Sequence, residues 1–375
     1  MGDSLWLSGP TPVLRSRALA AAPDVEIVGG GITGCSCALT LARAGKRVRL
    51  HEAREIASGA SGRNGGFALR GGAMAYDAAR EWLGRDWARE YWQLTEAYVD
   101  RMAQLAPDAV RRTGSLRLAG DAEEREELRR ELEALRQDGF VVEWREELAV
   151  PFAGSFAGAL FHPGDALLQP ARLVRRIAQA AADAGAEIRE QSRVNDLSEL
   201  DASLVVVATD GYPSGLLGEL EGLIIPTRGQ MLATAPLVER LYELPHYGRH
   251  GFDYWHQDAD GRLVVGGFRD SDLESEFTDS EETTPRIQAA LEEFAELLLG
   301  YRPRIEHRWA GVFGLVPDLI PVVGEVPGRE GAWVAGGYSG HGNVLGLMFG
   351  DLVARAIMGE RHPLLGATDP KRLLA

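Results

Sequence analysis

The stretch Asp24–Gly34 reads DVEIVGGGITG and is the most informative part of the sequence for predicting the fold. Its first six residues are typical of a short buried strand, and its glycines at 29, 31 and 34 form a GxGxxG pattern. A helical segment over Ile32–Ala44 follows, then a second strand over Lys46–His51 with Glu52 at its end. This order of strand, glycine turn, helix, strand and acid predicts a dinucleotide-binding βαβ unit.

Each glycine of this turn has a separate physical task. Gly29 permits the tight turn out of the strand, Gly31 lets a pyrophosphate approach the backbone, and Gly34 lets the helix pack closely on the sheet. The free N–H groups and the dipole at the start of the helix favour a phosphate there. Glu52 stands where a carboxylate can accept ribose hydroxyl groups, and an acid there disfavours a 2′-phosphate. From this unit alone NAD and FAD both remain possible, and a glycine turn without a ligand is the alternative interpretation.

The rest of the chain shows two kinds of pattern. The continuous apolar run Leu204–Ala208 predicts a central parallel strand, buried on both faces. Three shorter segments, at residues 228–234, 252–257 and 262–268, predict an antiparallel sheet. Near the end of the chain, a strand, a glycine cluster at 336–342 and a helix at 344–358 return to α/β character. The sequence therefore predicts a discontinuous cofactor domain that carries a second domain.

Two segments between these units carry further expectations. One long helix is predicted over Tyr76–Leu105, with Trp82, Trp87 and Trp92 on roughly one side of it. The segment Asp270–Glu282 holds seven acidic residues and is predicted to be a solvated loop.

Composition and charge exclude several classes of protein. Among the 375 residues, 55 Asp and Glu outnumber 40 Lys and Arg, so the formal net charge is −15, which disfavours nucleic-acid binding. No apolar run approaches 18 residues, so no membrane span is expected. Cys35 and Cys37 have the wrong spacing for a zinc ribbon or a CxxC redox pair, and no metal site is predicted. The absence of a disulfide framework favours the cytoplasm. The sequence makes no prediction of the oligomeric state.

Four segments, in this order along most of the chain, resemble one family of enzymes. They are IVGGGITG at Ile27–Gly34, GASGRNGG at Gly59–Gly66, TRGQML at Thr227–Leu232 and AGGYSGHGN at Ala335–Asn343. The chain thereby resembles the D-amino-acid-oxidase-like superfamily of flavoenzymes. Within it, the γ-glutamylputrescine oxidase and glycine/sarcosine oxidase group is the most similar.

The resemblance implies FAD as the cofactor and a Rossmann-like FAD-binding domain with an antiparallel-sheet substrate domain. Residues 1–75, 153–226 and 320–375 would form the first domain, and residues 76–152 and 227–319 the second. Glycines that precede a helix also place backbone donors where reduced flavin gathers negative charge. The cofactor contacts implied are Gly29, Gly31, Ile32, Thr33, Gly34, Glu52, Ala53, Ala60, Ser61, Arg63, Asn64, Gly65, Val194, Ala208, Thr209, Gly337, Tyr338, Ser339, Gly340, His341 and Gly342.

The chain departs from the family in two ways. The segment His307–Leu315 reads HRWAGVFGL and lacks the cysteine of the covalent members, so the FAD is expected to be non-covalent. Asn343 and Val344 stand where sarcosine oxidases have a lysine, and Leu263–Phe268 also lacks a lysine near the flavin. The resemblance therefore does not extend to sarcosine as the substrate or to fast reaction with oxygen.

The resemblance implies oxidation of the C–N bond of an amine or amino acid by hydride transfer to flavin N5. The imine is then hydrolysed and the flavin is reoxidised by O2. A secondary amine or a γ-glutamyl-polyamine-like compound is the favoured substrate. The alternatives are an amine dehydrogenase with a quinone or protein acceptor, a non-catalytic nucleotide-binding protein, and a flavoenzyme acting on tRNA, which the acidic charge disfavours.

Five side chains are candidates for the catalytic site. Tyr254 and His256 share one face of a predicted strand, with ordinary sheet packing as the alternative. Arg269 follows the next strand and could pair with a carboxylate or with neighbouring acids. Arg63 and His341 lie in the flavin-side segments, and His341 has a purely packing role as its alternative.

Overall fold

A parallel sheet forms one half of the molecule. The computed structural model describes residues 4–9, 13–146, 156–212 and 215–374. The six strands of this sheet run in the order β16-β17-β10-β1-β2-β9, and all neighbours are parallel except β16 and β17. Their bounds are Val25–Val28 (β1), Val48–His51 (β2), Glu187–Arg189 (β9), Leu204–Val207 (β10), Val322–Glu325 (β16) and Ala332–Gly336 (β17).

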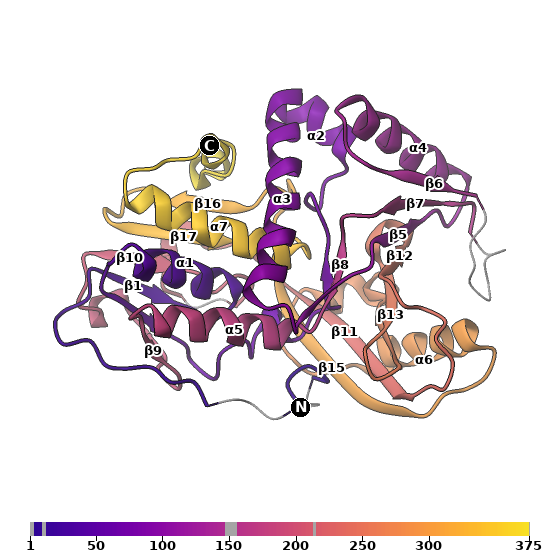
Figure 1. Ribbon diagram of the computed structural model, residues 1–375, viewed down its shortest axis with the longest axis horizontal. Coiled ribbons are helices and arrows are strands. Elements are labelled where there is room, and N and C mark those ends of the chain that lie inside the picture. Colours follow the sequence, from indigo (N-terminus) through magenta and orange to yellow (C-terminus); the bar gives the residue numbers. More distant parts are fainter. Residues whose placement is uncertain (1–3, 10–12, 147–155, 213–214, 375) are drawn as a thin grey trace.

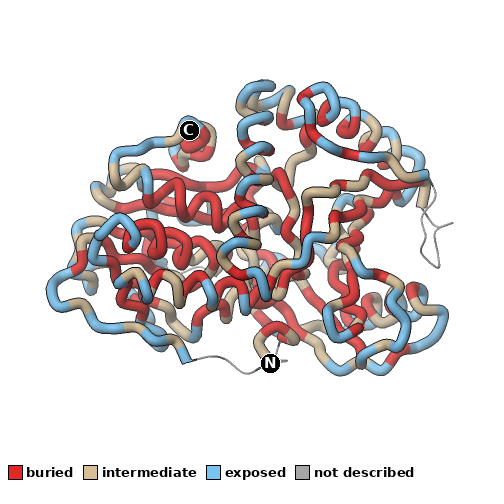
Figure 2. The backbone as a smooth tube through the Cα atoms, in the orientation of Figure 1, coloured by how far each residue is buried: buried red, intermediate tan, exposed pale blue. Residues whose placement is uncertain are grey.

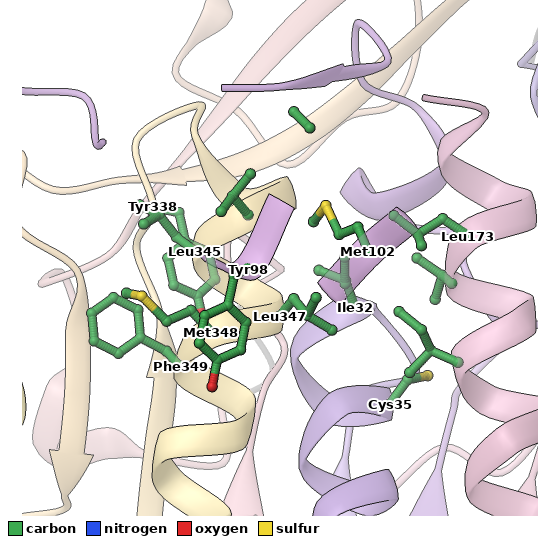
Figure 3. Packing of buried hydrophobic residues seen from close by; sticks show 14 of the residues in the cluster. Ile32, Cys35, Tyr98, Met102, Leu173, Tyr338, Leu345, Leu347, Met348 and Phe349 are labelled. Atoms are coloured by element: carbon green, nitrogen blue, oxygen red, sulfur yellow. The ribbon is translucent and has the colours of Figure 1, made fainter. Parts of the chain in front are cut away.

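Three helices lie side by side over this sheet, with α1 between the other two (Figure 1). They are α1 (Ile32–Arg43), α5 (Pro170–Asp183) and α7 (Gly342–Ile357). The contact between α1 and α7 is close, because a Cβ at Gly346 would lie 2.6 Å from Ile32 Cγ2 and a Cβ at Gly350 would collide with a backbone oxygen of α1. Figure 3 shows Ile32 facing Leu347 in this interface. The amino-terminal motif and the end of the chain are thus packed together.

A mostly antiparallel sheet of eight strands forms the other half, in the order β15-β11-β14-β13-β12-β5-β7-β6. The helix α6 (Pro285–Leu299) packs on one face, where Trp255 meets Phe294. On the other face, Tyr254 and His256 both contact Phe67, which confirms the predicted alternation. The strand bounds are Ser115–Leu118 (β5), Glu143–Arg145 (β6), Ala159–His162 (β7), Ile225–Pro236 (β11), His246–Gly248 (β12), Asp253–Gln257 (β13), Arg262–Gly267 (β14) and Ile305–Leu315 (β15).

A small third sheet and three further helices complete the fold. The sheet has the order β3-β8-β4, with bounds Phe67–Ala68 (β3), Val110–Arg112 (β4) and Ala166–Leu168 (β8). The helices are α2 (Tyr76–Leu83), α3 (Arg85–Leu105) and α4 (Ala122–Gln137). Figure 2 shows that α1 and α7 are buried almost throughout, whereas α4 exposes much of its surface.

The prediction of a single helix over Tyr76–Leu105 is wrong. Gly84 separates α2 from α3, with a φ of +89° that a helix does not allow and that favours glycine. The three tryptophans therefore do not share one helix side. Trp82 is 62% exposed at the end of α2, while Trp92 is buried in α3.

The prediction of a solvated loop over Asp270–Glu282 is also wrong for two of its acids. Glu276 is fully buried and accepts two hydrogen bonds from the Arg228 guanidinium, at 2.7 and 3.0 Å. Glu281 is buried as well and pairs with Arg54. Guanidinium groups from distant parts of the chain compensate the burial of these carboxylates, which a local reading of an acidic run does not reveal.

The predicted fold class, with a parallel nucleotide-type sheet and an antiparallel sheet, is confirmed. The division into two domains stays a prediction, and its boundary at residues 152/153 lies outside the described residues. Within the described part of the chain, no helix combines the length and the apolar character needed to cross a membrane.

Candidate functional site

A cavity of about 450 Å³ opens at the carboxyl ends of the parallel strands, where α/β sheets commonly bind nucleotides. Residues that follow β1, β2 and β10 all contribute to its wall. Fifteen of the predicted cofactor contacts line it: Gly29, Gly31, Ile32, Thr33, Glu52, Ala53, Ala60, Ser61, Asn64, Val194, Ala208, Thr209, Tyr338, Gly340 and Gly342.

The glycine turn after β1 adopts the geometry that its residues require. Gly29 has a φ of +113°, and a Cβ there would lie 2.5 Å from the Ala208 carbonyl oxygen. A Cβ at Gly34 would collide with the Gly29 carbonyl oxygen, so α1 packs directly on the turn. Gly31 caps α1 without any side-chain hydrogen bond, and the Ile32 N–H donates to Ser61 Oγ at 3.0 Å. The start of α1 thus presents backbone donors to the cavity.

Glu52 closes the turn from the end of β2. Its Oε2 accepts a hydrogen bond from the Gly30 N–H at 2.7 Å, and its Oε1 accepts one from the Arg54 N–H at 2.8 Å. A carboxylate has about four acceptor positions, so two remain for ligand hydroxyl groups. The position of Glu52 in the cavity wall makes those acceptors accessible.

The glycine-rich loop after β2 meets the start of α7. Asn64 Nδ2 donates to Asn343 Oδ1 and Asn343 Nδ2 donates to Asn64 Oδ1, both at 3.1 Å. Asn343 also donates to the Phe67 carbonyl oxygen at 2.8 Å. Two sequence segments from opposite ends of the chain therefore form one wall.

A second cavity, of about 210 Å³, meets the first. Ala60, Asn64, Phe313, Gly340 and Asn343 line both. The second cavity extends over the eight-stranded sheet toward β5 and β12. Among the described residues that line it there are two arginines and no carboxylate.

Tyr254 and His341 line the second cavity and are both uncharged at neutral pH. Burial raises the pKa of Tyr254 to about 12 and lowers the pKa of His341 to about 4. The Tyr254 ring lies against the sheet, since a Cβ at Gly266 would overlap it and one at Gly65 would lie 3.2 Å from it. His341 is the N-cap residue of α7, and its buried Nδ1 has no hydrogen-bond partner.

Arg63 also lines the second cavity, but its guanidinium is occupied. It donates from Nε to the Ser58 carbonyl oxygen at 2.8 Å and from Nη1 to the Ala310 carbonyl oxygen at 3.3 Å. Glu281 lies 3.6 Å away on the side of the larger cavity. Arg63 thus fastens the loop to β15 where the two cavities meet.

The other two catalytic candidates lie outside the lining of both cavities. The His256 ring stacks on Trp6, with centroids 6.0 Å apart and an interplanar angle of 8°. The Arg269 guanidinium lies over the Phe252 and Phe313 rings, 4.6 and 5.9 Å from their centroids. Arg269 thus lies beside Phe313, which lines both cavities, and its charge also acts on Tyr254, where it opposes the rise in pKa that burial causes.

Six predicted cofactor contacts lie outside the lining of the larger cavity. Gly34 packs α1 on the turn, as described above. Arg63, Gly65 and His341 line the second cavity. The Gly337 N–H donates to Asp210 Oδ1 at 2.8 Å, and Ser339 Oγ accepts a hydrogen bond from the Val316 N–H at 3.1 Å. Gly337 and Ser339 therefore support residues of the cavity wall through these hydrogen bonds and do not line the cavity themselves.

Several site residues were missed by the sequence. Glu281 lines the larger cavity and accepts hydrogen bonds from Arg54, at 2.7 and 3.0 Å, and from Tyr212 Oη at 2.6 Å. Arg117 and Tyr247 line the second cavity. Asn343 is the last residue of the segment Ala335–Asn343 that resembles the flavoenzyme family. No sequence motif surrounds Glu281, Arg117 or Tyr247.

The larger cavity fits a dinucleotide such as FAD. Backbone donors at the start of α1 suit a pyrophosphate, and Glu52 suits a ribose. The close approach of the turn also depends on positions that a Cβ would fill, as at Gly31, where it would lie 3.0 Å from Ser61 Oγ. Within the described ranges, no group of three or more His, Cys, Asp or Glu side chains could hold a metal ion.

Comparisons with known proteins agree with this geometry. The model of the family described as FAD dependent oxidoreductase matches residues 24–356. The chain is 28% identical to the probable oxidoreductase OrdL of Rhizobium meliloti, over 91% of this chain and 84% of that one. It is 29% identical to the gamma-glutamylputrescine oxidoreductase of Escherichia coli, over 90% and 84%. The crystal structure of glycine oxidase from Geobacillus kaustophilus superposes with a TM-score of 0.78 and 25% identity, over 94% of this chain and 99% of that one.

Proposed function

The chain belongs to the FAD dependent oxidoreductase family, and on that premise we propose that it oxidises the C–N bond of an amine or amino acid. The glycine turn after β1 and Glu52 would hold FAD in the larger cavity, and the substrate would bind in the second cavity. The relatives named for glycine and γ-glutamylputrescine support this class of substrate. A secondary amine or a γ-glutamyl-polyamine-like compound remains the favoured substrate.

The main support for this proposal is that the two cavities meet. Five residues line both, so a ring that extends from the larger cavity would face the second one there. The pair of Asn64 and Asn343 fixes this junction from two sides. When bound, FAD supplies the acceptor for the hydride from the carbon beside the amine nitrogen.

The chain itself contributes orientation and a low-polarity environment. Phe67, Tyr254, Val312 and Phe313 give the second cavity apolar surface that holds the substrate and excludes water. The start of α7 presents backbone N–H groups at the junction, which favours negative charge there. These two features act on the position of the substrate and on charge at the junction, without a dedicated base.

The second cavity also favours the neutral form of an amine. Oxidation requires a free nitrogen lone pair, so the substrate ammonium must lose its proton. Burial lowers the pKa of an ammonium, and no described residue of the cavity wall offers a carboxylate that would raise it again. His341, whose pKa is lowered to about 4, adds no positive charge near the junction.

The FAD is proposed to be non-covalent and the acceptor to be O2. Cys35 and Cys37 are fully buried on α1, and burial raises the pKa of both thiols, so neither is a reactive nucleophile. A dehydrogenase that passes electrons to a quinone or a protein is the alternative. The proposal includes a cytoplasmic location for the enzyme.

A panel of amines and amino acids, scored by anaerobic bleaching of the flavin absorption band, tests the function. The proposal predicts bleaching by at least one class of amine, followed by recovery of the band when air is admitted. Slow recovery in air but fast recovery with a quinone would replace the oxidase with a dehydrogenase. No bleaching by any polyamine, N-methyl amine or amino acid would overturn the proposal.

A further inference from the structure

We propose that Arg117 anchors a carboxylate at the end of the substrate remote from the oxidised amine. The enzyme would then prefer amino compounds whose carboxylate and reacting nitrogen are several bonds apart. This inference rests on the proposed function, and it adds a binding residue and a substrate shape.

The contacts of Arg117 leave hydrogen-bond donors free for a ligand. Its Nη1 donates to Glu131 Oε2 at 2.6 Å, and Glu131 in turn accepts a hydrogen bond from the Tyr76 N–H at 3.1 Å. The Arg117 Nε is buried and has no hydrogen-bond partner. A buried donor without an acceptor is unfavourable, and this one belongs to a side chain that lines the second cavity. A ligand carboxylate would satisfy it.

The charge balance of the cavity points to the same residue. The Arg63 guanidinium already bonds two backbone carbonyl oxygens at the cavity junction, and Glu281 lies 3.6 Å from it. Arg117 stays protonated. Burial lowers its pKa, but Glu131 and other neighbouring groups outweigh this and raise the pKa above its ordinary value. No carboxylate lines the cavity among its described residues, although Glu131, which pairs with Arg117, offsets part of its charge. A planar guanidinium with a fixed orientation suits bidentate binding of a carboxylate.

The position of Arg117 in the sheet sets the distance to the amine. Arg117 on β5 pairs directly with Tyr247 on β12, and Tyr247 pairs with Tyr254 on β13, so all three side chains share the cavity face. The Arg117 guanidinium lies over the Tyr247 ring, 5.8 Å from its centroid. β5 and β12 lie on the side of the molecule away from α1 and α7 (Figure 1).

The number of intervening strands gives the scale of this separation. Gly229 lines the cavity on β11, four strand spacings from β5. At about 4.8 Å per strand, the two backbones are roughly 19 Å apart across the sheet. The Arg117 guanidinium itself lies nearer to the junction, because its charge acts on His341, which adjoins the junction residue Gly340. A compound such as glycine, with its carboxylate on the reacting carbon, is too short to bridge that separation. A chain of several methylene groups or a γ-glutamyl amide has the required length.

The alternative is that Arg117 only fastens α4 to the sheet through Glu131. The length of the substrate and the charge at its far end distinguish the two roles. A residue that only holds α4 on the sheet would not change the preference between substrates with and without a carboxylate. The probes are the ω-amino acids from 4-aminobutanoate to 8-aminooctanoate, each compared with the alkyl amine of the same length. Hexanoate alone, titrated against the flavin absorption spectrum, measures anchoring without oxidation.

The variants are Arg117→Met and Arg117→Lys, together with the double variant R117M/E131Q, which leaves no unpaired buried carboxylate. Arg262→Met is the matched control, because Arg262 lies on β14 of the same sheet, pairs with Glu306 and does not line the cavity. Melting temperatures of all variants show whether the fold is retained. If R117M is unstable, the double variant gives the comparison.

The expected result is a preference of the parent enzyme for the longer ω-amino acids over the matched amines in kcat/KM. R117M and the double variant should lose this preference by about tenfold or more through KM, and should bind hexanoate more weakly by a similar factor. Arg117→Lys should retain part of it, and Arg262→Met all of it.

An unchanged ratio of acid to amine in the R117M and double variants would overturn the inference, as would a parent enzyme that prefers the amine at every length. Failure of every amine to bleach the flavin would count against the proposed function instead. The hexanoate titration would then still decide the role of Arg117.

Discussion

The side-chain amides of Asn64 and Asn343 exchange two hydrogen bonds of 3.1 Å, although the two residues are 279 positions apart in the chain. Each also holds its own surroundings, because Asn64 Oδ1 accepts from the Gly66 N–H and Asn343 Nδ2 donates to the Phe67 carbonyl oxygen, both at 2.8 Å. The pair lines both cavities. It therefore ties the amino-terminal loop to the start of α7 where cofactor and substrate are proposed to meet.

Replacement of Asn343 by Ala should weaken FAD binding. The substitution removes the two hydrogen bonds with Asn64, whose amide keeps its other bonds within the loop, and it removes the side-chain donor to the Phe67 carbonyl oxygen. Their loss costs about 1–3 kcal/mol, or about tenfold in affinity where FAD binding depends on the wall that the pair forms. Quenching of FAD fluorescence on titration into apoprotein measures this. Asn195→Ala, at an exposed asparagine of the same cavity region, is the control and should change nothing. Equal affinities for parent and N343A would contradict the role of the pair.

Glu52→Gln should also weaken FAD binding while the fold is retained. The amide keeps one acceptor oxygen but replaces the other by a donor, which conflicts with the Gly30 and Arg54 N–H groups and with ribose hydroxyls. The same fluorescence titration measures the loss. Glu55→Gln, at an exposed neighbour, removes the same charge without these contacts. A loss of affinity in both variants alike would show that only the net charge matters.

The site residues that could be predicted from the sequence are those that belong to one short, continuous motif. Gly29, Gly31 and Glu52 follow each other within one βαβ unit, so their spacing alone predicts a nucleotide cavity, and the structure places all three in its wall. The segments at 59–66 and 335–343 could be found from their likeness to a family. Nothing in either segment, however, reveals that Asn64 faces Asn343.

The residues that escaped prediction depend on contacts across the fold. Arg117 lies in an ordinary strand, SLRL, and it gains its meaning from Glu131 and Tyr247 on other elements. Glu281 lies in an acidic run that reads as a solvated surface, yet Arg54 and Tyr212 draw it into the wall. His256 was predicted correctly for its strand face, but Trp6, far away in the sequence, covers it.

Gly350→Ala should destabilise the protein. A methyl group there would collide with the Thr33 carbonyl oxygen and force α7 away from α1. Overpacking of this kind costs about 1–3 kcal/mol, which thermal unfolding monitored by circular dichroism can measure. Gly366→Ala is the matched control, since a Cβ there meets no atom within 4 Å. If both variants melt at the parent temperature, the helix contact is looser than described.

Glu281 should make the region around the larger cavity sensitive to acid. Burial alone raises the pKa of Glu281, but hydrogen bonds from Arg54 and Tyr212 outweigh it and hold the pKa below its usual range. A carboxyl whose pKa is lowered by folding stabilises the folded state above its unfolded pKa, and this contribution is lost as the pH falls through the folded value. Glu281→Gln should therefore melt at a lower temperature than the parent at pH 7. The difference between the two melting temperatures should be smaller at pH 3.

The neighbouring Glu282→Gln provides the control for this prediction. Glu282 is exposed, and its interaction with Arg228 uses the backbone carbonyl oxygen, which the substitution retains. Melting temperatures at pH 3, 5 and 7 should match those of the parent. A pH-independent difference between E281Q and the parent would contradict an ionised Glu281.

His341→Gln should change the rate without changing the pH profile between pH 6 and 8. Burial lowers the pKa of His341 to about 4, so the ring is neutral across that range and its titration produces no limb there. The measurement is kcat/KM against pH for parent and variant with one amine. A limb near pH 6.5 that disappears in H341Q would show a solvated, titrating ring.

Hydride transfer at the cavity junction can be measured as the rate of anaerobic flavin reduction by an amine that carries deuterium on the carbon beside nitrogen. In the proposed reaction, that carbon would lie at the junction of the two cavities, and its C–H bond would break in the step that bleaches the flavin. Bleaching should therefore be slower with the deuterated amine than with the ordinary one. Equal rates for the two, or no bleaching by either, would contradict the proposed reaction.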